Sequence, residues 1–228
     1  MLLKVARPGT LVQVTETFLS IQGEGRKMGL PTAFVRTTGC HLRCVWCDAA
    51  YAFYGGSKRT LDDLVAWCAN QPTKEVCFTG GEPLLQKDAW EFVERLLTNG
   101  QSVLIETSGN ISFAHANTLP APQRARLCIS MDVKCPGSGM AAKNDLSLLK
   151  ELREPDQLKF VVADRADFDF ALNVVRQHAP FPCPVYVNPV GGLDPKSITE
   201  WLLAEKDPPA VHVGIQLHKL VWGDVPGR

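Results

Sequence analysis

The sequence predicts an α/β fold built on a mainly parallel sheet. Short apolar runs rich in β-branched residues recur along the chain of 228 residues, and helical segments separate most of them. This alternation is typical of parallel strands joined by crossover helices. A chain of this length suits one full α/β domain better than two. We therefore expect a single domain over residues 1–228, with its core at about 12–219 and a C-terminal tail at 220–228.

The strands and helices can be placed from apolar runs and from signals at helix ends. The expected strands are residues 12–18, 33–36, 76–79, 103–106, 127–133, 158–162, 185–187 and 212–216. Thr60 followed by Asp63 resembles a capping box, Asp88 can cap a helix over 89–98, and Gly100 suits its end. Further helices are expected at 166–178 and 197–204. Proline, asparagine and serine between 110 and 123 oppose a long helix, so one crossover should be shortened.

The composition argues against several classes of protein. Lys plus Arg equals Asp plus Glu, at 24 each, so no overall positive field would attract nucleic acid or an anionic membrane. No apolar run approaches the roughly 18 residues of a membrane-spanning helix. The eight cysteines are unevenly spaced, and the first ten residues show no secretory segment. We therefore expect a reducing, cytoplasmic location, with no nucleic-acid or membrane partner.

Cys40, Cys44 and Cys47 form a C-x3-C-x2-C triplet with no fourth cysteine nearby. Thiolates that converge from a short, turn-rich loop can hold an iron–sulfur cluster, and three of them leave one iron of a four-iron cluster open. An open iron can take the amino and carboxylate groups of S-adenosylmethionine (SAM). Two alternatives stay open: a zinc site completed by a remote fourth ligand, or cysteines that are simply part of the core.

Polar segments that carry glycine, or that carry charge, follow many of the expected strands. They are residues 40–47, 79–83, 106–109, 132–134 and 188–191. Because the carboxyl ends of parallel strands in a barrel meet on one rim, these segments predict a single site.

The motifs together resemble the radical SAM superfamily. The segment TGGEP at 79–83 directly follows a strand and comes after the cysteine triplet, as it does in that superfamily. Other motifs narrow the resemblance to the 7-carboxy-7-deazaguanine synthases of queuosine (7-deazaguanine) biosynthesis. These are FLSIQGEG at 18–25, FVR at 34–36, Cys47-Asp48 with Tyr51, LLQ at 84–86, IETSG at 105–109 and QLHK at 216–219. The resemblance implies a trimmed partial (β/α) barrel of the radical SAM type, which suits a shortened crossover.

The resemblance also implies a [4Fe-4S] cluster on the three cysteines and a SAM site around it. Trp46 would lie by the adenine, and Gly80, Gly81 and Glu82 would bind the methionine amino group. The other SAM residues that the resemblance implies are Cys47, Asp48, Ser108, Asp132, Val133, Lys134, Asn188, Pro189, Val190 and Gly191. Ordinary alternatives are a packing role for Trp46 and a solvated Lys134.

The implied substrate is 6-carboxy-5,6,7,8-tetrahydropterin. The residues that would hold it are Ile21, Gln22, Gly23, Glu24, Arg36, Thr79, Gln216 and His218. Glu24 suits the donor-rich pyrimidine edge of a pterin, and Arg36 offers a fork for its carboxylate. Each also has a structural alternative, since Glu24 could cap a turn, Arg36 could pair with a surface carboxylate, and His218 could belong to the core.

One position departs from the family pattern. Family members usually carry threonine directly after the Cys-Asp pair, where its hydroxyl can ligate a Mg²⁺ ion that bridges to the substrate, and this chain has Ala49. Mg²⁺ takes oxygen ligands and keeps several waters, so substrate, water and Asp48 would have to hold the ion.

The implied activity is that of a radical SAM carbon–nitrogen lyase with no catalytic side chain beyond the cluster and SAM. A radical formed from SAM would take hydrogen from C6 of the pterin, and ring contraction with loss of ammonia would give 7-carboxy-7-deazaguanine. A flavodoxin- or ferredoxin-type electron donor and a homodimer are also implied. Two other functions stay open: activation of a glycyl-radical enzyme, and a non-catalytic iron–sulfur or zinc module.

Overall fold

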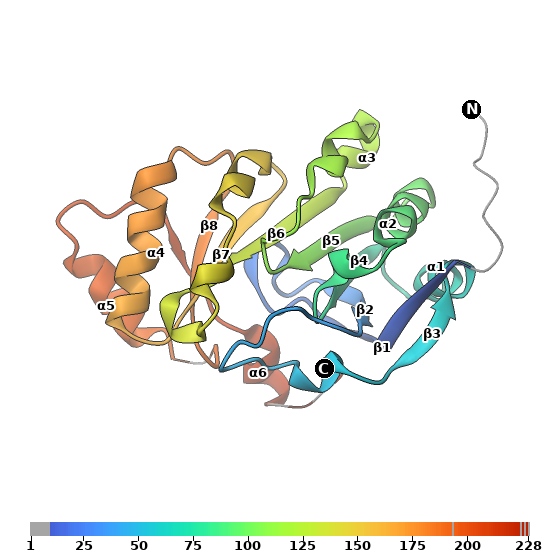
Figure 1. Cartoon of the computed structure of the whole chain (residues 1–228), viewed down its shortest axis with the longest axis horizontal. Coiled ribbons are helices and arrows are strands. Elements are labelled where there is room, and N and C mark those ends of the chain that lie inside the picture. Colours follow the sequence, from blue (N-terminus) through green and yellow to red (C-terminus); the bar gives the residue numbers. More distant parts are fainter. Residues whose placement is uncertain (1–9, 193, 224, 226, 228) are drawn as a thin grey trace.

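The computed structural model describes residues 10–192, 194–223, 225 and 227. These residues form a nine-stranded sheet in the order β3-β1-β2-β4-β5-β6-β7-β8-β9 (Figure 1). The strands are β1 (Leu11–Ile21), β2 (Pro31–Thr37), β3 (Ser57–Thr60), β4 (Glu75–Gly80), β5 (Ser102–Thr107), β6 (Leu127–Val133), β7 (Gln157–Val162), β8 (Val185–Pro189) and β9 (His212–Val213). In the order of the sheet, each neighbouring pair of strands from β2 through β4 to β9 is parallel. Strand β1 is antiparallel to both β2 and β3. The sheet does not close, so the fold is the predicted partial barrel with a mainly parallel sheet.

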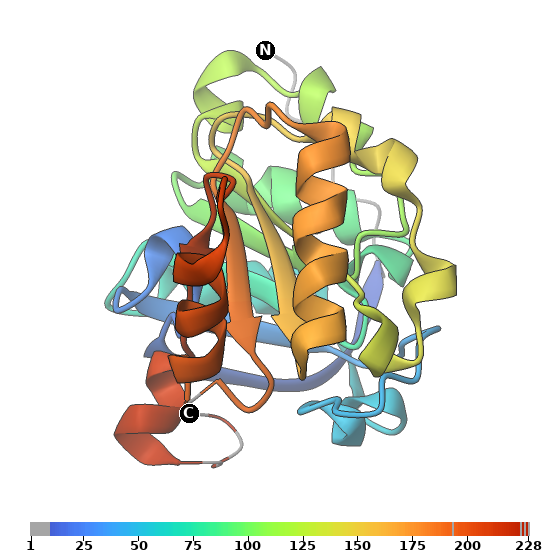
Figure 2. The same cartoon turned by 90° about the vertical axis from the view of Figure 1, so that its left-hand side faces the viewer.

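Four helices of the described chain cover one face of this sheet, namely α1 (Leu61–Ala69), α2 (Ala89–Thr98), α4 (Arg165–His178) and α5 (Lys196–Ala204). The short α3 (Ala121–Arg124) lies in the connection from β5 to β6, and α6 (Leu217–Trp222) follows β9. Figure 2 shows α4 and α5 side by side in front of the strands. The buried side chains of α1, α2, α4 and α5 join alternate side chains of the strands in one large hydrophobic core. No described helix has the length and apolar character needed to cross a bilayer.

Strand alternation divides the side chains between the two faces. On β4, Val76 and Phe78 belong to the helix-side core, whereas Cys77 belongs to a small cluster on the other face. On β7, Leu158 and Phe160 likewise enter the main core. Since successive side chains of a strand point to opposite faces, Lys159 must face away from the helices.

The helix ends follow the sequence signals in part. The Thr60 hydroxyl accepts a hydrogen bond from the Asp63 backbone N–H at 3.1 Å, which starts α1 as predicted. Asp88 stands at the start of α2 but makes no side-chain capping bond, so that expectation is wrong in its mechanism. Gly100 follows α2 with φ of +87°, a conformation that glycine adopts without strain. The crossover between β5 and β6 is shortened as expected, because it holds a 3-10 turn and the four-residue α3.

Three elements differ from the expectations. The strand expected over 212–216 ends at Val213, because Gly214 donates its N–H to Val187 and the Gln216 N–H then bonds Gly192 outside the ladder. The helix α6 follows at once, so the expected boundary between core and tail falls inside a helix. Strand β3 was not expected, since its sequence is polar and its first residues are exposed. Of the expected tail, residues 224, 226 and 228 lie outside the described part.

Candidate active site

A cavity of about 230 Å³ opens on the face of the sheet away from the helices. Strands β2, β4, β5, β6, β7 and β8 contribute side chains to it from positions that alternate with those of the core. These residues include Phe34, Arg36, Thr79, Glu106, Ser130, Asp132, Lys159, Val161 and Asn188. The cysteine loop, the loop after β1 and the start of α6 complete the wall.

The structure brings most of the expected site residues to this cavity. The lining includes Ile21, Gln22, Gly23, Glu24, Arg36, Cys40, Cys44, Trp46, Cys47, Asp48, Ala49, Thr79, Gly80, Gly81, Ser108, Asp132, Lys134, Asn188, Pro189, Gly191, Gln216 and His218. Glu82, Val133 and Val190 are not part of the lining. Val133 lies in the helix-side core, as its place in the strand alternation requires.

The cysteine loop is anchored by its backbone. The Gly39 N–H bonds the Ala52 carbonyl at 2.8 Å, and the guanidinium of Arg43 donates to the carbonyls of Cys40 and Leu42 at 2.7 Å each. The same guanidinium lies 4.3 Å from the ring centroid of Phe53. All eight cysteines are free thiols. These contacts fix the loop that carries the triplet against the edge of the cavity.

The triplet differs from the other cysteines in exposure. Cys40, Cys44 and Cys47 are half-buried, whereas the remaining five are buried. Burial raises the pKa of the Cys44 and Cys47 thiols, so ligation of a cluster must displace their protons. Among the described residues no three Cys, His, Asp or Glu side chains converge on a single metal ion, whereas three thiolates of a four-iron cluster each bind a different iron and stay apart. Their number, type and place on one wall fit a four-iron cluster with an open iron.

The double glycine passes directly against the cysteine loop. Gly81 donates its N–H to Thr37, and the Glu82 N–H bonds the Gly39 carbonyl at 2.8 Å. A Cβ on Gly81 would stand 2.2 Å from that same Gly39 oxygen, closer than any side chain can approach. Glycine is therefore required here by the close approach of two loops.

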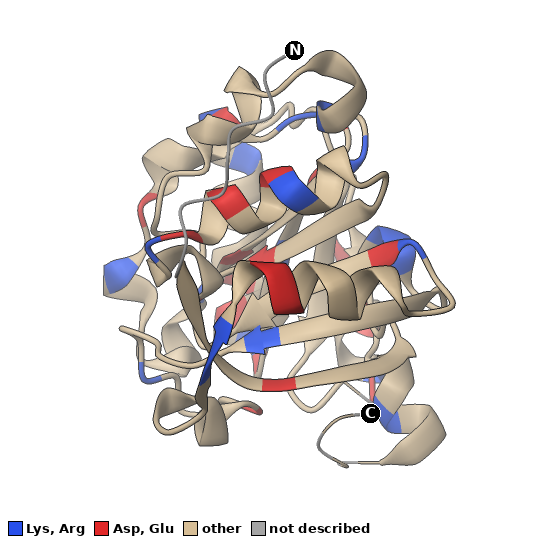
Figure 3. Cartoon of the chain, turned by 90° about the vertical axis from the view of Figure 1, so that its right-hand side faces the viewer, with Lys and Arg blue, Asp and Glu red and all other residues tan. Residues whose placement is uncertain are grey.

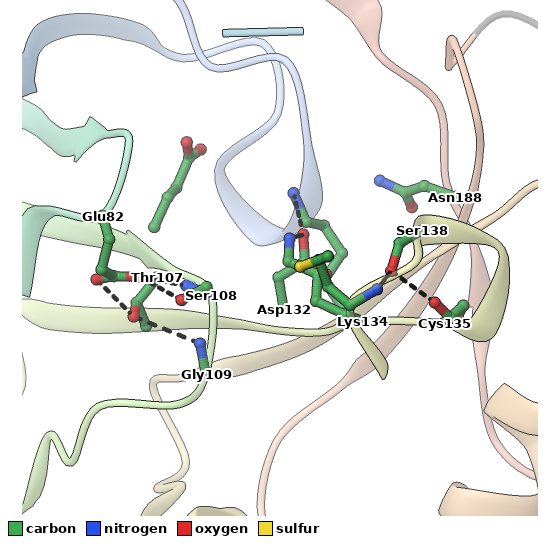
Figure 4. Close-up of polar contacts among 12 residues, drawn as sticks. Glu82, Thr107, Ser108, Gly109, Asp132, Lys134, Cys135, Ser138 and Asn188 are labelled. Atoms are coloured by element: carbon green, nitrogen blue, oxygen red, sulfur yellow. Dashed lines mark hydrogen bonds and ion pairs between the residues drawn. The ribbon is translucent and has the colours of Figure 1, made fainter. Parts of the chain in front are cut away.

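Glu82 anchors the double-glycine strand end to the end of β5 rather than facing the cavity. Its fully buried carboxylate accepts hydrogen bonds from the Thr107 hydroxyl at 2.9 Å, the Ser108 N–H at 2.7 Å and the Ser108 hydroxyl at 2.5 Å (Figure 4). The Leu84 N–H adds a fourth bond at 3.0 Å. With these donors satisfying the carboxylate, the expected direct contact of Glu82 with an amino group is not supported by its position.

A second carboxylate, Glu24, collects donors from three separate elements. It accepts from the Lys159 ammonium at 2.8 Å, the Asn188 amide at 3.2 Å and the Gln216 amide at 2.5 Å. Burial alone would raise the pKa of Glu24, but the Lys159 charge and the hydrogen bonds from Lys159 and Gln216 lower it below its usual value. Glu24 is therefore an anion whose hydrogen-bond donors come largely from the protein itself.

Gln22 and Thr79 both donate to a carboxylate that the sequence analysis did not select. The Glu106 oxygens accept from the Gln22 amide at 3.2 Å and from the Thr79 hydroxyl at 2.9 Å. The Gln22 amide oxygen in turn accepts the Glu24 N–H at 3.2 Å. Glu106 belongs to the IETSG motif, and strand alternation alone would have placed it on the cavity side, opposite Ile105.

Arg36 is held by one edge of its guanidinium. Its Nε donates to Glu16 at 2.7 Å, and the Tyr51 hydroxyl donates to the same oxygen at 2.8 Å. The rings of Phe18 and Tyr51 each lie 5.8 Å from the guanidinium carbon. Within the described residues Nη1 and Nη2 make no hydrogen bond, so two N–H-bearing atoms remain for a ligand.

His218 reaches the cavity from α6 and packs on the loop after β1. The Leu217 N–H bonds the Gly23 carbonyl at 2.9 Å, and a Cβ on Gly23 would fall 1.9 Å from the Nδ1 atom of His218. Burial lowers the pKa of His218, which keeps the imidazole neutral near pH 7. Gly23 therefore lets the first loop and the C-terminal helix meet.

The other half of the cavity carries a charged pair and unpaired acceptors. Lys134 lies 3.0 Å from Asp132, and both stand at the carboxyl end of β6 (Figure 4). Three buried oxygens of the lining have no hydrogen-bond partner in the described structure, namely Asp132 Oδ1, Asn188 Oδ1 and Gln216 Oε1. Asn188 Oδ1 lies against Gly214 and Gln216 Oε1 against Gly192, so Asp132 Oδ1 is the acceptor among the three that fits a hydroxyl or N–H donor of a ligand such as SAM or a pterin.

Ala49 offers no side-chain ligand for Mg²⁺. Its carbonyl oxygen accepts the Ala52 N–H at 2.9 Å, and the side chain is buried. Asp48, by contrast, is exposed beside it. The residues at this position therefore do not fit a magnesium site built on a side-chain hydroxyl.

Comparison with known proteins agrees with this geometry. Residues 34–119 match the family model of the radical SAM superfamily. The chain is 41% identical over 214 residues to the 7-carboxy-7-deazaguanine synthase of Thermoplasma acidophilum, covering 94% of this chain and 99% of that protein. It is 38% identical to the enzyme of that name from Koribacter versatilis, covering 92% and 97%. The crystal structure of QueE from Escherichia coli has the same fold, with a TM-score of 0.71 at 21% identity over 92% of this chain and 96% of that one. The chain therefore belongs to the 7-carboxy-7-deazaguanine synthase family of the radical SAM superfamily.

Proposed function

We propose that this protein is a radical SAM lyase that converts 6-carboxy-5,6,7,8-tetrahydropterin to 7-carboxy-7-deazaguanine with loss of ammonia. The observation that carries the proposal is one cavity with three thiols on its wall and, across it, a set of polar side chains suited to an anionic pterin. Full-length similarity to enzymes of that name supports it.

Cys40, Cys44 and Cys47 would hold the [4Fe-4S] cluster, and SAM would lie between the double glycine and β8. When bound, the cluster and SAM supply the one-electron chemistry that removes a hydrogen atom from the substrate. Asp132 offers an unpaired oxygen to hydroxyl or amino donors there, and Asn188 lines the same side. Lys134 offers a cation to a carboxylate on the same side.

The substrate would lie between Arg36 and the Glu106 network. The free Nη atoms of Arg36 can form a fork with the pterin carboxylate. Glu106 uses two of its acceptor sites on Gln22 and Thr79, which leaves others for the N–H groups of the pyrimidine edge. Glu24 is less available to the pterin than the sequence suggests, because three donors of the protein already hydrogen-bond to its carboxylate.

The chain's own contribution is positioning and exclusion of water. The strand residues of the lining come from six parallel strands of one sheet, which can hold the pterin C6 at reacting distance from SAM. Mg²⁺, if the reaction uses it, would depend on substrate, water and Asp48. A flavodoxin- or ferredoxin-type electron donor, a homodimer and a cytoplasmic location are the remaining parts of the proposal, and family membership supports them.

Anaerobic reconstitution with iron and sulfide, followed by incubation with SAM, dithionite and the pterin, tests this function. Mass spectrometry should show 7-carboxy-7-deazaguanine forming only when all components are present. Reductive cleavage of SAM without consumption of the pterin would contradict the assignment and favour activation of a partner protein. Absence of SAM cleavage in protein with a full cluster would favour a non-catalytic iron–sulfur module.

A further inference from the structure

We infer that Lys159 is a positioning residue that couples the two halves of the cavity, so that SAM and the pterin each strengthen binding of the other. This inference rests on the proposed function. It begins from the position of Lys159 in β7, where Asp132 of β6 is its neighbour in the parallel register. Alternation directs its side chain into the cavity, between the rim of β6 and the loop after β1.

The Lys159 ammonium joins a carboxylate from each half. It lies 2.8 Å from Glu24 on the substrate side and 3.7 Å from Asp132 on the SAM side. Asp132 also meets Lys134 at 3.0 Å, so two lysines and two carboxylates form one chain of alternating charge. The four side chains are between 11% and 18% exposed, and this burial limits screening of their interactions by salt.

Glu24, held by Lys159, in turn orients two amide side chains. Asn188 and Gln216 both direct their NH₂ groups to the Glu24 carboxylate, which turns their oxygens away from it. Those two oxygens, Asn188 Oδ1 and Gln216 Oε1, lie against Gly214 and Gly192 and have no hydrogen-bond partner in the described structure. The ion pair with Lys159 holds Glu24 in place, and so determines how both amides are oriented.

One ordered network therefore serves ligands on both sides. A SAM molecule that pairs with Asp132 or Asn188 fixes the Lys159 bridge and, through it, Glu24 and Gln216. The pterin then meets Glu24 and Gln216 side chains that are already ordered, and the same linkage holds in reverse. Replacing Lys159 by methionine breaks this connection while keeping a side chain of similar length in the cavity.

Equilibrium binding to protein with an oxidised cluster tests the coupling, because neither ligand reacts without an electron. Titration calorimetry would give the Kd of the pterin with and without saturating SAM. We expect SAM to tighten pterin binding at least roughly fivefold in wild type, the lower end of typical coupling. In Lys159→Met the ratio of the two Kd values should fall to about one, whereas Lys159→Arg, which keeps a cation, should retain most of it. The matched control is Lys143→Met, which removes an exposed lysine outside the cavity and should couple as wild type does.

The double variant Glu24→Gln/Lys159→Met removes one charge of each sign and so remains testable should the single variant fail to fold. It should also show a ratio near one. A wild-type ratio in Lys159→Met, or in the double variant, would overturn the inference. So would equal weakening of pterin binding with and without SAM in Lys159→Met, which would make Lys159 a contact for one ligand rather than a bridge. Failure of wild type to bind the pterin at all would count against the proposed function instead.

Discussion

Some residues of this site can be identified from the sequence by their type, whereas others can be identified only from their position in the fold. Cysteines at cluster spacing and an arginine before them stand out in any sequence. Lys159 and Glu106 do not, because each lies in an apolar strand and one charged side chain in such a run is usually solvated. Their importance depends on which face of the sheet they occupy and on partners such as Glu24, which is 135 positions away from Lys159.

Arg36 should bind the substrate carboxylate through the edge of its guanidinium that Glu16 leaves free. Arg36→Lys keeps the charge but loses the fork, so pterin binding should weaken by about 1–3 kcal/mol, or roughly five- to 150-fold in Kd. Calorimetry on cluster-free protein measures this without turnover. Arg165→Lys, at a surface pair with Asp169, is the control and should bind as wild type does. Unchanged affinity in Arg36→Lys would refute the assignment.

The three loop cysteines should be the cluster ligands. Alanine at Cys40, Cys44 or Cys47 should lower the iron content of reconstituted protein and its brown absorbance. Alanine at Cys77 or Cys128, which are buried on the same face of the sheet, should leave roughly four irons per chain. Iron analysis with absorption spectroscopy decides, and equal loss in both sets would show that the triplet is not special.

Ala49 tests how this chain manages without the family's hydroxyl. Ala49→Thr restores an oxygen ligand beside Asp48, so half-maximal turnover should need less Mg²⁺ than in wild type. The measurement is initial rate against Mg²⁺ concentration. Ala49→Val, close in shape to threonine but without the hydroxyl, is the control and should not lower the requirement. Superimposable curves for wild type and Ala49→Thr would mean that the position has no role in metal binding.

At the scale of elements, alternating patterns were predictable and irregular connections were not. The β6 strand matches its expected limits, and the helices α4 and α5 begin one residue earlier than expected. The crossover from β6 to β7 has three short 3-10 segments, which no hydrophobic periodicity in the sequence predicts. Strand β3 was not predicted because it pairs with β1 at the sheet edge through its backbone, and its first side chains are exposed. Where backbone bonds rather than apolar burial define an element, the sequence carries little signal.

Alanine at Gly81 and alanine at Gly23 should have different effects, because the two glycines lie against different parts of the site. In Gly81→Ala the new Cβ would collide with the Gly39 carbonyl at 2.2 Å, so the cysteine loop must shift and iron content should fall. In Gly23→Ala the new Cβ would meet the His218 ring, so pterin affinity should fall while iron content stays normal. Iron analysis and calorimetry on both variants form a matched comparison. Loss of iron in Gly23→Ala, or its retention in Gly81→Ala, would contradict these placements.

Across the whole molecule, the sheet brings both ends of the described chain to one cavity. The loop after β1 supplies Glu24 and the start of α6 supplies Gln216, and their side chains meet at 2.5 Å. Residues of opposite charge alternate along the helices and strands, as the ribbon in Figure 3 shows from one side, and the formal net charge is zero. With no overall charge to generate repulsion near neutral pH, acid sensitivity should depend on particular carboxylates.

Glu24 should be one of those carboxylates. Burial works to raise its pKa, yet the Lys159 charge and its hydrogen bonds leave the pKa below the ordinary value of 4.5. The unfolded chain therefore binds a proton at Glu24 before the folded chain does. The stability that Glu24 contributes is fully present above pH 4.5 and is lost as the pH falls through the lower, folded-state pKa. Urea unfolding between pH 7 and pH 3 should show a shallower loss of stability in Glu24→Gln than in wild type, by at most about 1.4 kcal/mol per pH unit for one proton.

Glu205 provides the contrast, because its pKa is also lowered, by hydrogen bonds from Arg176 and Arg165, but these two arginine partners are nearly half exposed. Salt screens exposed pairs and reaches buried ones poorly. Raising the ionic strength should therefore merge the Glu205→Gln curve with wild type while the Glu24→Gln curve stays distinct. If the Glu24→Gln curve also merges, the ion pair with Lys159 is open to solvent. The carboxylate would then be too weakly held to orient Asn188 and Gln216 for a ligand.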